Sequence, residues 1–128
     1  MGATVLLLHE MPDGLRHYDW MLEREVLGGG DPDERSLVTF RLGEPFEAGI
    51  KVFAAERIGD HRRAYLTFEG SVPGGRGVVS RVSAGTCEIL EETESWICVE
   101  LELGELCGRI EGTRGDGGIW DFVVLSRG

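Results

Sequence analysis

The chain has 128 residues, of which 41% are hydrophobic, and its formal net charge is −10 at pH 7. This length and composition suit one folded domain over residues 1–128 and exclude an intrinsically disordered chain. The negative charge argues against nonspecific nucleic-acid binding over the whole surface, and no apolar run is long enough for a membrane-spanning helix.

The 20 glycines divide the chain into short segments that alternate or are rich in β-branched residues. These patterns predict strands over residues 4–9, 17–25, 36–42, 50–55, 64–69, 78–82, 86–90, 96–103, 106–111 and 120–125. Residues 28–33 and 73–77 are rich in glycine and proline and predict turns. The spacing predicts an all-β fold, either a sandwich or a small closed or nearly closed β-barrel of about eight short, mostly antiparallel strands.

Three cysteines, Cys87, Cys98 and Cys107, lie in apolar strand contexts, and no two of them form a Cys-x-x-Cys pair. Their odd number and spacing predict neither a disulfide framework nor a zinc site. The apolar start of the chain lacks the basic residues and cleavage site of a signal peptide. We therefore expect reduced, inert cysteines and a cytoplasmic protein.

Residues 51–81 form the only third of the chain with a net positive charge, because Lys51 and five arginines stand against three acids. A protein that binds phosphate is expected to bind it there, around His61. The alternative is that these basic residues are only solvated, and charge alone favours that alternative.

All three histidines lie where a single site could use them. His17 and Asp19 are two residues apart on a predicted strand, so their side chains project from the same face. The short loop over residues 11–14 can return the chain and bring His9 beside them. Two imidazoles and a carboxylate suit a divalent metal such as Mn²⁺ or Zn²⁺ and leave open coordination positions. The alternative is a surface histidine–aspartate pair that only hydrogen-bonds.

His61 and Tyr65 are four residues apart and share a face if this segment is extended. A histidine can bind or protonate a phosphate oxygen, and a tyrosine hydroxyl can donate a hydrogen bond to it. The alternative is a turn histidine beside a half-buried strand tyrosine, and the spacing does not decide between the two.

Residues 15–23 read Leu-Arg-His-Tyr-Asp-Trp-Met-Leu-Glu, and residues 61–73 read His-Arg-Arg-Ala-Tyr-Leu-Thr-Phe-Glu-Gly-Ser-Val-Pro. Together with His9, residues 104–109 and residues 120–125, these segments resemble the 3′-phosphoesterase domain of bacterial DNA repair ligase D, which also occurs as a stand-alone protein. The resemblance spans nearly the whole chain in the right order, and residues 61–73 are its most specific part.

The resemblance implies a small β-barrel with a Mn²⁺ site, in which Zn²⁺ or Co²⁺ could also bind. It implies removal of 3′-phosphate and 3′-terminal ribonucleotide groups from DNA ends in end-joining repair. Carried over, His9, His17 and Asp19 would be metal ligands, His61 would contact the scissile phosphate, and Tyr65 would support that phosphate. DNA 3′ ends would be the substrate, and a ligase or polymerase acting in trans would be the protein partner.

Met21 stands where the family usually has an arginine, two residues after Asp19 and on the same face. A thioether cannot replace a bidentate, charge-assisted clamp on phosphate. Losing one such donor costs about 2.7–4 kcal/mol of transition-state stabilisation. Arg16, Arg41 and Arg76 are the candidates for a compensating phosphate ligand.

Two other functions stay open beside the DNA-end phosphoesterase. One is a binding module that keeps the metal or anion pocket but lacks turnover. The other is a phosphoesterase of a small phosphorylated molecule, which suits the charge of −10 better. A basic groove from His61 past Arg62, Arg63 and Arg76 would favour nucleic acid, and a closed acidic rim would favour the small substrate.

Overall fold

The computed structural model describes residues 1–25 and 31–126, and the predicted all-β architecture is confirmed. Within these residues, nine strands form one antiparallel sheet. The strands are β1 (Gly2–Glu10), β2 (Arg16–Glu23), β3 (Leu37–Leu42), β4 (Val52–His61), β5 (Gly70–Ser71), β6 (Val78–Glu92), β7 (Trp96–Leu103), β8 (Leu106–Arg114) and β9 (Ile119–Ser126).

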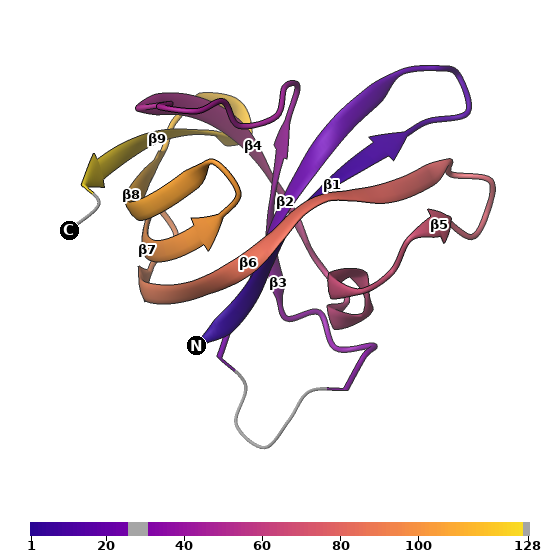
Figure 1. Ribbon diagram of the computed structural model, residues 1–128, viewed down its shortest axis with the longest axis horizontal. Coiled ribbons are helices and arrows are strands. Elements are labelled where there is room, and N and C mark those ends of the chain that lie inside the picture. Colours follow the sequence, from indigo (N-terminus) through magenta and orange to yellow (C-terminus); the bar gives the residue numbers. More distant parts are fainter. Residues whose placement is uncertain (26–30, 127–128) are drawn as a thin grey trace.

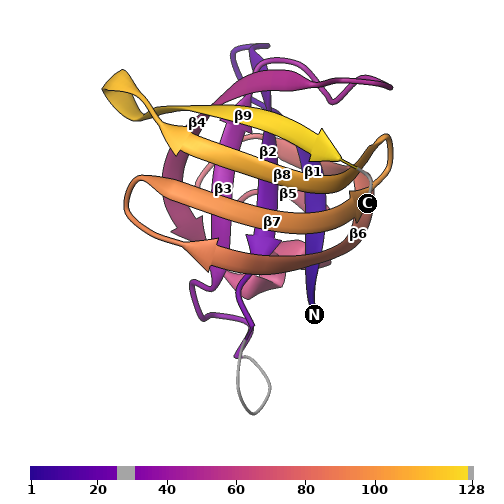
Figure 2. The same cartoon turned by 90° about the vertical axis from the view of Figure 1, so that its left-hand side faces the viewer.

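The sheet curls until its hydrogen bonds run through a nearly closed ring. Its strand order is β1-β2-β3-β4-β9-β8-β7-β6-β5, and β1 also pairs with β6. Eight strands therefore make up the ring, and the short β5 is attached outside it along β6. Figure 2 shows β6–β9 running across β1–β3, so the two groups of strands enclose the core between them.

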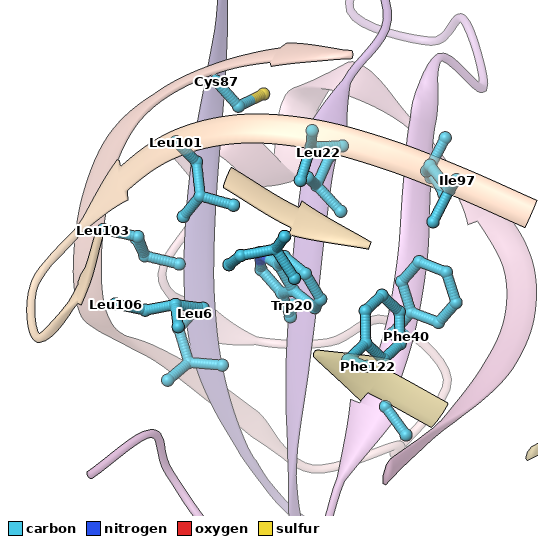
Figure 3. Packing of buried hydrophobic residues seen from close by; sticks show 14 of the residues in the cluster. Leu6, Trp20, Leu22, Phe40, Cys87, Ile97, Leu101, Leu103, Leu106 and Phe122 are labelled. Atoms are coloured by element: carbon cyan, nitrogen blue, oxygen red, sulfur yellow. The ribbon is translucent and has the colours of Figure 1, made fainter. Parts of the chain in front are cut away.

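The main core fills the inside of the ring. Trp20 lies at its centre, with no exposed surface, and its indole is ringed by four phenylalanines. Figure 3 shows leucines and isoleucine from β1, β2, β7 and β8 packed around this aromatic group. The indole nitrogen donates a hydrogen bond to the Thr4 hydroxyl, which itself donates to the Met21 carbonyl, so the buried polar groups are satisfied.

A second hydrophobic cluster lies on the outer face of β1–β3. It consists of Val5, Leu7, Met21 and Leu37, and side chains of the 3₁₀ helix η1 (Arg63–Leu66) pack against it. Figure 1 shows η1 and β5 to the right of these strands and β7–β9 to the left. Because β1–β3 are covered on both faces, their central residues form continuous buried runs, whereas residues 99–103 of β7 alternate.

The strand predicted over residues 64–69 is wrong, because most of this segment is the helix η1 and an irregular stretch. The amides of Arg63 and Ala64 donate to the carbonyls of Glu34 and Pro32, and the amide of Thr67 donates to Ala64. Loop residues far away in sequence thus take the hydrogen bonds that a strand would give to a neighbouring strand. His61 and Tyr65 consequently do not share an extended segment.

One further prediction differs from the structure, and one cannot be compared in full. The strands expected over residues 78–82 and 86–90 are one strand, β6. Part of the predicted turn over residues 28–33 lies outside the described residues. The described helices are η1 and the three-residue η2 (Asp116–Gly118), and neither is long or apolar enough to cross a membrane.

Candidate metal centre

The hairpin of β1 and β2 carries the three predicted metal ligands. His9 pairs directly with His17, and Leu7 pairs with Asp19 in the same antiparallel register. Paired residues and residues two apart share a face of the sheet. His9, His17 and Asp19 therefore all project from the outer face, beside the cluster covered by η1. The prediction that these residues come together is confirmed.

The three side chains converge on a small volume. The Oδ2 atom of Asp19 lies 3.3 Å from Nε2 of His17 and 3.9 Å from Nδ1 of His9. One ligand atom from each residue lies within 4.8 Å of the other two. Ligand bonds of roughly 2.0–2.2 Å place neighbouring donor atoms about 3–4 Å apart, so small side-chain adjustments suffice to surround one ion.

His9 is held in the tautomer that a metal requires. Its Nε2–H donates a 2.6 Å hydrogen bond to the backbone carbonyl of Arg76, because a carbonyl can only accept. The lone pair is then on Nδ1, the atom that faces Asp19. Metal-ligating histidines in proteins are commonly oriented in this way by a carbonyl on the other ring nitrogen.

His17 also has the environment of a metal ligand. Its Nε2 atom is buried and forms no well-aligned hydrogen bond among the described residues; its polar neighbour is Oδ2 of Asp19 at 3.3 Å. Burial lowers the pKa of His17 below its ordinary value, and the charge of Asp19 opposes this only in part, while Arg41 and His9 add to the lowering. The imidazole is therefore kept neutral, which is the form that binds metal. The residues present fit a divalent ion.

The three predicted phosphate-binding arginines lie in different places. Arg41 on β3 pairs with Asp19 in register, and its Nε lies 3.4 Å from Oδ1 of that carboxylate. Arg76 contributes its carbonyl to His9, while its Nε donates to the Pro73 carbonyl. Arg16 precedes His17 on β2, so it belongs to the opposite face. Only Arg41 has its guanidinium beside the three ligands.

His61 and Tyr65 lie together, but away from the three ligands. Their rings meet edge to face at 5.6 Å, and the His61 Nδ1–H donates to the Gly59 carbonyl. His61 pairs with Leu37, which pairs with Glu23, four residues along β2 from Asp19. Four strand residues span about 13 Å, and no contact in residues 1–25 and 31–126 joins His61 to the ligands. The roles expected for both residues stay predictions.

Several arginines of the positively charged third make contacts within the protein. Arg62 lies 3.8 Å from Asp33, and Arg63 forms a 2.7 Å ion pair with Glu23. Arg57 lies near Asp60 and Glu92. The groove proposed from His61 past Arg62, Arg63 and Arg76 is therefore built from side chains that already have partners.

The carbonyl of Arg76 is a functional group that the sequence did not reveal. The turn before β6 reaches β1 because Gly77 has a φ of 95° and lacks a Cβ, which would meet the Glu10 carbonyl. The amide of Val72 donates to the Gly77 carbonyl and closes the turn. The glycine-rich segment 73–77 was the available signal, but it indicated only a connection.

No protein-family model matches this chain, and no curated protein matches its sequence.

Proposed function

We propose that this protein is a divalent-metal-dependent phosphoesterase whose ion is bound by His9, His17 and Asp19. The observation that carries the proposal is the convergence of three ligand atoms within 4.8 Å, among them the buried Nε2 of His17, which forms no well-aligned hydrogen bond, and an imidazole of fixed tautomer. An unsatisfied buried polar atom is costly, and a bound cation would remove that cost. Three protein ligands also leave positions for water or substrate.

For the substrate, we propose the 3′ ends of DNA, carrying a 3′-phosphate or a 3′-ribonucleotide, with Mn²⁺ as the ion. The support is the motif resemblance of residues 15–23 and 61–73 to the 3′-phosphoesterase domain. The donor set agrees with Mn²⁺, but it also suits Zn²⁺ or Co²⁺. A ligase or polymerase acting in trans stays part of this proposal.

Each residue of the site has a distinct part in this reaction. A bound divalent ion would polarise a phosphoryl oxygen and lower the pKa of a water molecule. The bond from Nε2 of His9 to the Arg76 carbonyl leaves Nδ1 facing the other two ligands, and Asp19 supplies the negative charge. His61 and Tyr65 lie farther along the same face, beyond reach of a phosphate on the ion, and are proposed to contact a neighbouring phosphate of the DNA strand.

A second candidate is a phosphoesterase of small phosphorylated molecules. Two observations favour it: the charge of −10 and the internal pairing of arginines around His61. A long DNA strand needs a continuous basic track, whereas a compact phosphate monoester needs only the site itself. A pure binding module is the remaining alternative.

A metal titration followed by an end-processing assay tests the proposal. Wild-type protein should bind one Mn²⁺ ion by calorimetry and remove 3′-phosphate and a 3′-ribonucleotide from a primer–template. His17→Ala should lose both properties, and His61→Ala should bind Mn²⁺ but process ends more slowly. Turnover of p-nitrophenyl phosphate without DNA processing would favour the second candidate. Failure of the wild-type protein to bind any of Mn²⁺, Zn²⁺ and Co²⁺ would refute the proposed function.

A further inference from the structure

We propose that Arg41 is the residue that binds the phosphate oxygens of the substrate at the metal centre. This inference rests on the proposed function and deepens it, because it names the anion-binding group that the chain has in place of an arginine at position 21. The ligand class is a tetrahedral phosphate monoester or a phosphate dianion.

The position of Arg41 on the sheet brings it to the ligands. Arg41 lies opposite Asp19 in the β2–β3 register, so both side chains project from the outer face. Oδ1 of Asp19 faces Nε of Arg41 at 3.4 Å, while Oδ2 faces the two histidines. One carboxylate thus separates the guanidinium from the volume where the ion would bind. A phosphate on the ion would lie within reach of Arg41.

The contact between Arg41 and Asp19 leaves most of the guanidinium available. Arg24 shows what a saturated pair looks like in this protein, because it donates to both oxygens of Glu92 at 2.9 and 2.6 Å and also to Asp60. Arg41 instead makes one long contact through Nε. Among the described residues, its two terminal nitrogens have no acceptor. They can form the two parallel hydrogen bonds that suit a phosphate.

Exposure and charge agree with this role. The side chain of Arg41 is 39% exposed, whereas that of Asp19 is 5% exposed, so the guanidinium stands at the mouth of the site. With neutral histidines, a divalent ion, Asp19 and Arg41 together carry a net positive charge. Glu56 lies across from Arg41 on β4, but Asp19 is the one carboxylate within ion-pair distance of Arg41 in the described part of the chain. The site attracts anions although the whole protein is acidic.

The other candidates are less well placed for the same task. Met21 is 1% exposed and belongs to the cluster beneath η1. Arg81, opposite Leu7 on β6, donates its Nη2 to the Leu66 carbonyl. Arg16 and Arg76 are turned away or bonded to backbone, as described above. Of these arginines, Arg41 is therefore the one whose guanidinium lies beside the metal ligands, because the β2–β3 register places it opposite Asp19.

Binding of inorganic phosphate to the Mn²⁺-loaded protein tests this inference without any turnover. Mn²⁺ affinity is first measured by calorimetry for wild type, Arg41→Ala, Arg41→Lys and Arg16→Ala. Phosphate affinity is then measured from the broadening of the ³¹P resonance by the bound Mn²⁺. Arg16→Ala is the matched control, because it removes an exposed arginine from the opposite face. Circular dichroism establishes that each variant is folded.

We expect Arg41→Ala to bind Mn²⁺ at least as tightly as wild type, because a positive charge beside Asp19 is removed. We expect its phosphate affinity to fall about 10- to 100-fold, with Arg41→Lys intermediate and Arg16→Ala unchanged. Unchanged phosphate affinity in a folded Arg41→Ala or Arg41→Lys protein overturns the inference and leaves the metal centre intact. Absence of phosphate binding to Mn²⁺-loaded wild type also overturns it. Absence of Mn²⁺ binding to wild type removes the proposed function and this inference together.

Discussion

The imidazole of His17 occupies a position where an apolar side chain would make the metal-free protein more stable. The ring is mostly buried, its Nε2 forms no well-aligned hydrogen bond among the described residues, and burial lowers its pKa. Such a group destabilises the metal-free protein and stabilises the metal-bound one. The same residue therefore lowers stability and supplies function, and the two effects can be measured separately.

Replacing His17 with leucine should raise the stability of the metal-free protein. Leucine has a similar volume and no unsatisfied nitrogen, so we expect the free energy of unfolding in EDTA to rise by about 1 kcal/mol. Wild type should gain about 2.7 kcal/mol at a Mn²⁺ concentration 100 times its Kd, and His17→Leu should gain nothing. Urea denaturation with and without Mn²⁺ measures both quantities.

His61→Leu is the matched control for this change, because the Nδ1–H of His61 donates to the Gly59 carbonyl. That variant should lose stability in EDTA and still gain from Mn²⁺. A loss of stability in His17→Leu as large as that in His61→Leu would show that Nε2 of His17 is satisfied in solution.

The three cysteines differ in burial, and their reactivity should follow it. Cys87 is 1% exposed, and burial raises its pKa to about 11, whereas Cys107 is partly exposed. Native protein treated with iodoacetamide at pH 8 should be modified at Cys107 first, as read by mass spectrometry. Equal rates at Cys87 and Cys107 would contradict the buried position of Cys87.

The raised pKa of Cys87 also makes the free energy of unfolding depend on pH, and the sign of this dependence follows from the direction of the shift. The folded state keeps this proton to higher pH than the unfolded state, whose thiol has a pKa near 9. The stabilising contribution is present below pH 9 and is lost as the pH rises towards 11. Wild type should therefore lose about 2 kcal/mol more than Cys87→Ala over this range in urea denaturation. Parallel curves for the two proteins would contradict the shift.

At the scale of the element, the β1–β2 hairpin explains which part of the site the sequence could predict. Two-residue periodicity and a short turn are local properties, so they were enough to group His9, His17 and Asp19. Arg41 and the Arg76 carbonyl depend on the register between strands and on a turn distant in sequence. That register comes from the packing of the whole ring, which no local pattern encodes.

The difference between local patterns and long-range contacts also explains which strand predictions were right. The bounds predicted for residues 96–103 match β7, because the alternation over residues 99–103 reflects one buried and one exposed face. Residues 64–69 also alternate, but the amides of Arg63 and Ala64 bond to the loop at residues 34 and 32, and η1 packs its side chains on β1–β3. Long-range hydrogen bonds decided that segment, so its local pattern predicted the wrong element.

The helix η1 also determines what an arginine at position 21 would do. Met21 is buried with Val5, Leu7 and Leu37, so Met21→Arg would bury a charge without a partner. We expect this variant to lose at least about 3 kcal/mol of unfolding free energy, with no gain in phosphate binding. Met21→Leu is the control and should lose less than about 1.5 kcal/mol. A Met21→Arg protein of wild-type stability with tighter phosphate binding would show that η1 leaves this position open.

At the scale of the whole molecule, β6 is the strand that closes the ring. Its first part pairs with β1 and its last part with β7, and the two pairings overlap near Gly85. A Cβ at Gly85 would meet the backbone carbonyl of Glu102, so the close approach of β6 and β7 depends on a glycine there. The ring that holds the hairpin in place therefore depends in part on this close approach of β6 and β7.

Gly85→Ala should force β7 away from β6 and weaken the closure. Backbone atoms cannot move aside as a flexible side chain can, so we expect a loss of about 2–4 kcal/mol in urea denaturation. Gly43→Ala is the matched control: no atom lies within 4 Å of its added Cβ, and its stability should change by less than about 0.5 kcal/mol. His9 lies at the other end of β1, five residues from Thr4, which is opposite Gly85, and His17 on β2 pairs with His9. The Mn²⁺ affinity of folded Gly85→Ala should therefore equal that of wild type, and a matching loss of affinity would show that ring closure itself orders the ligands.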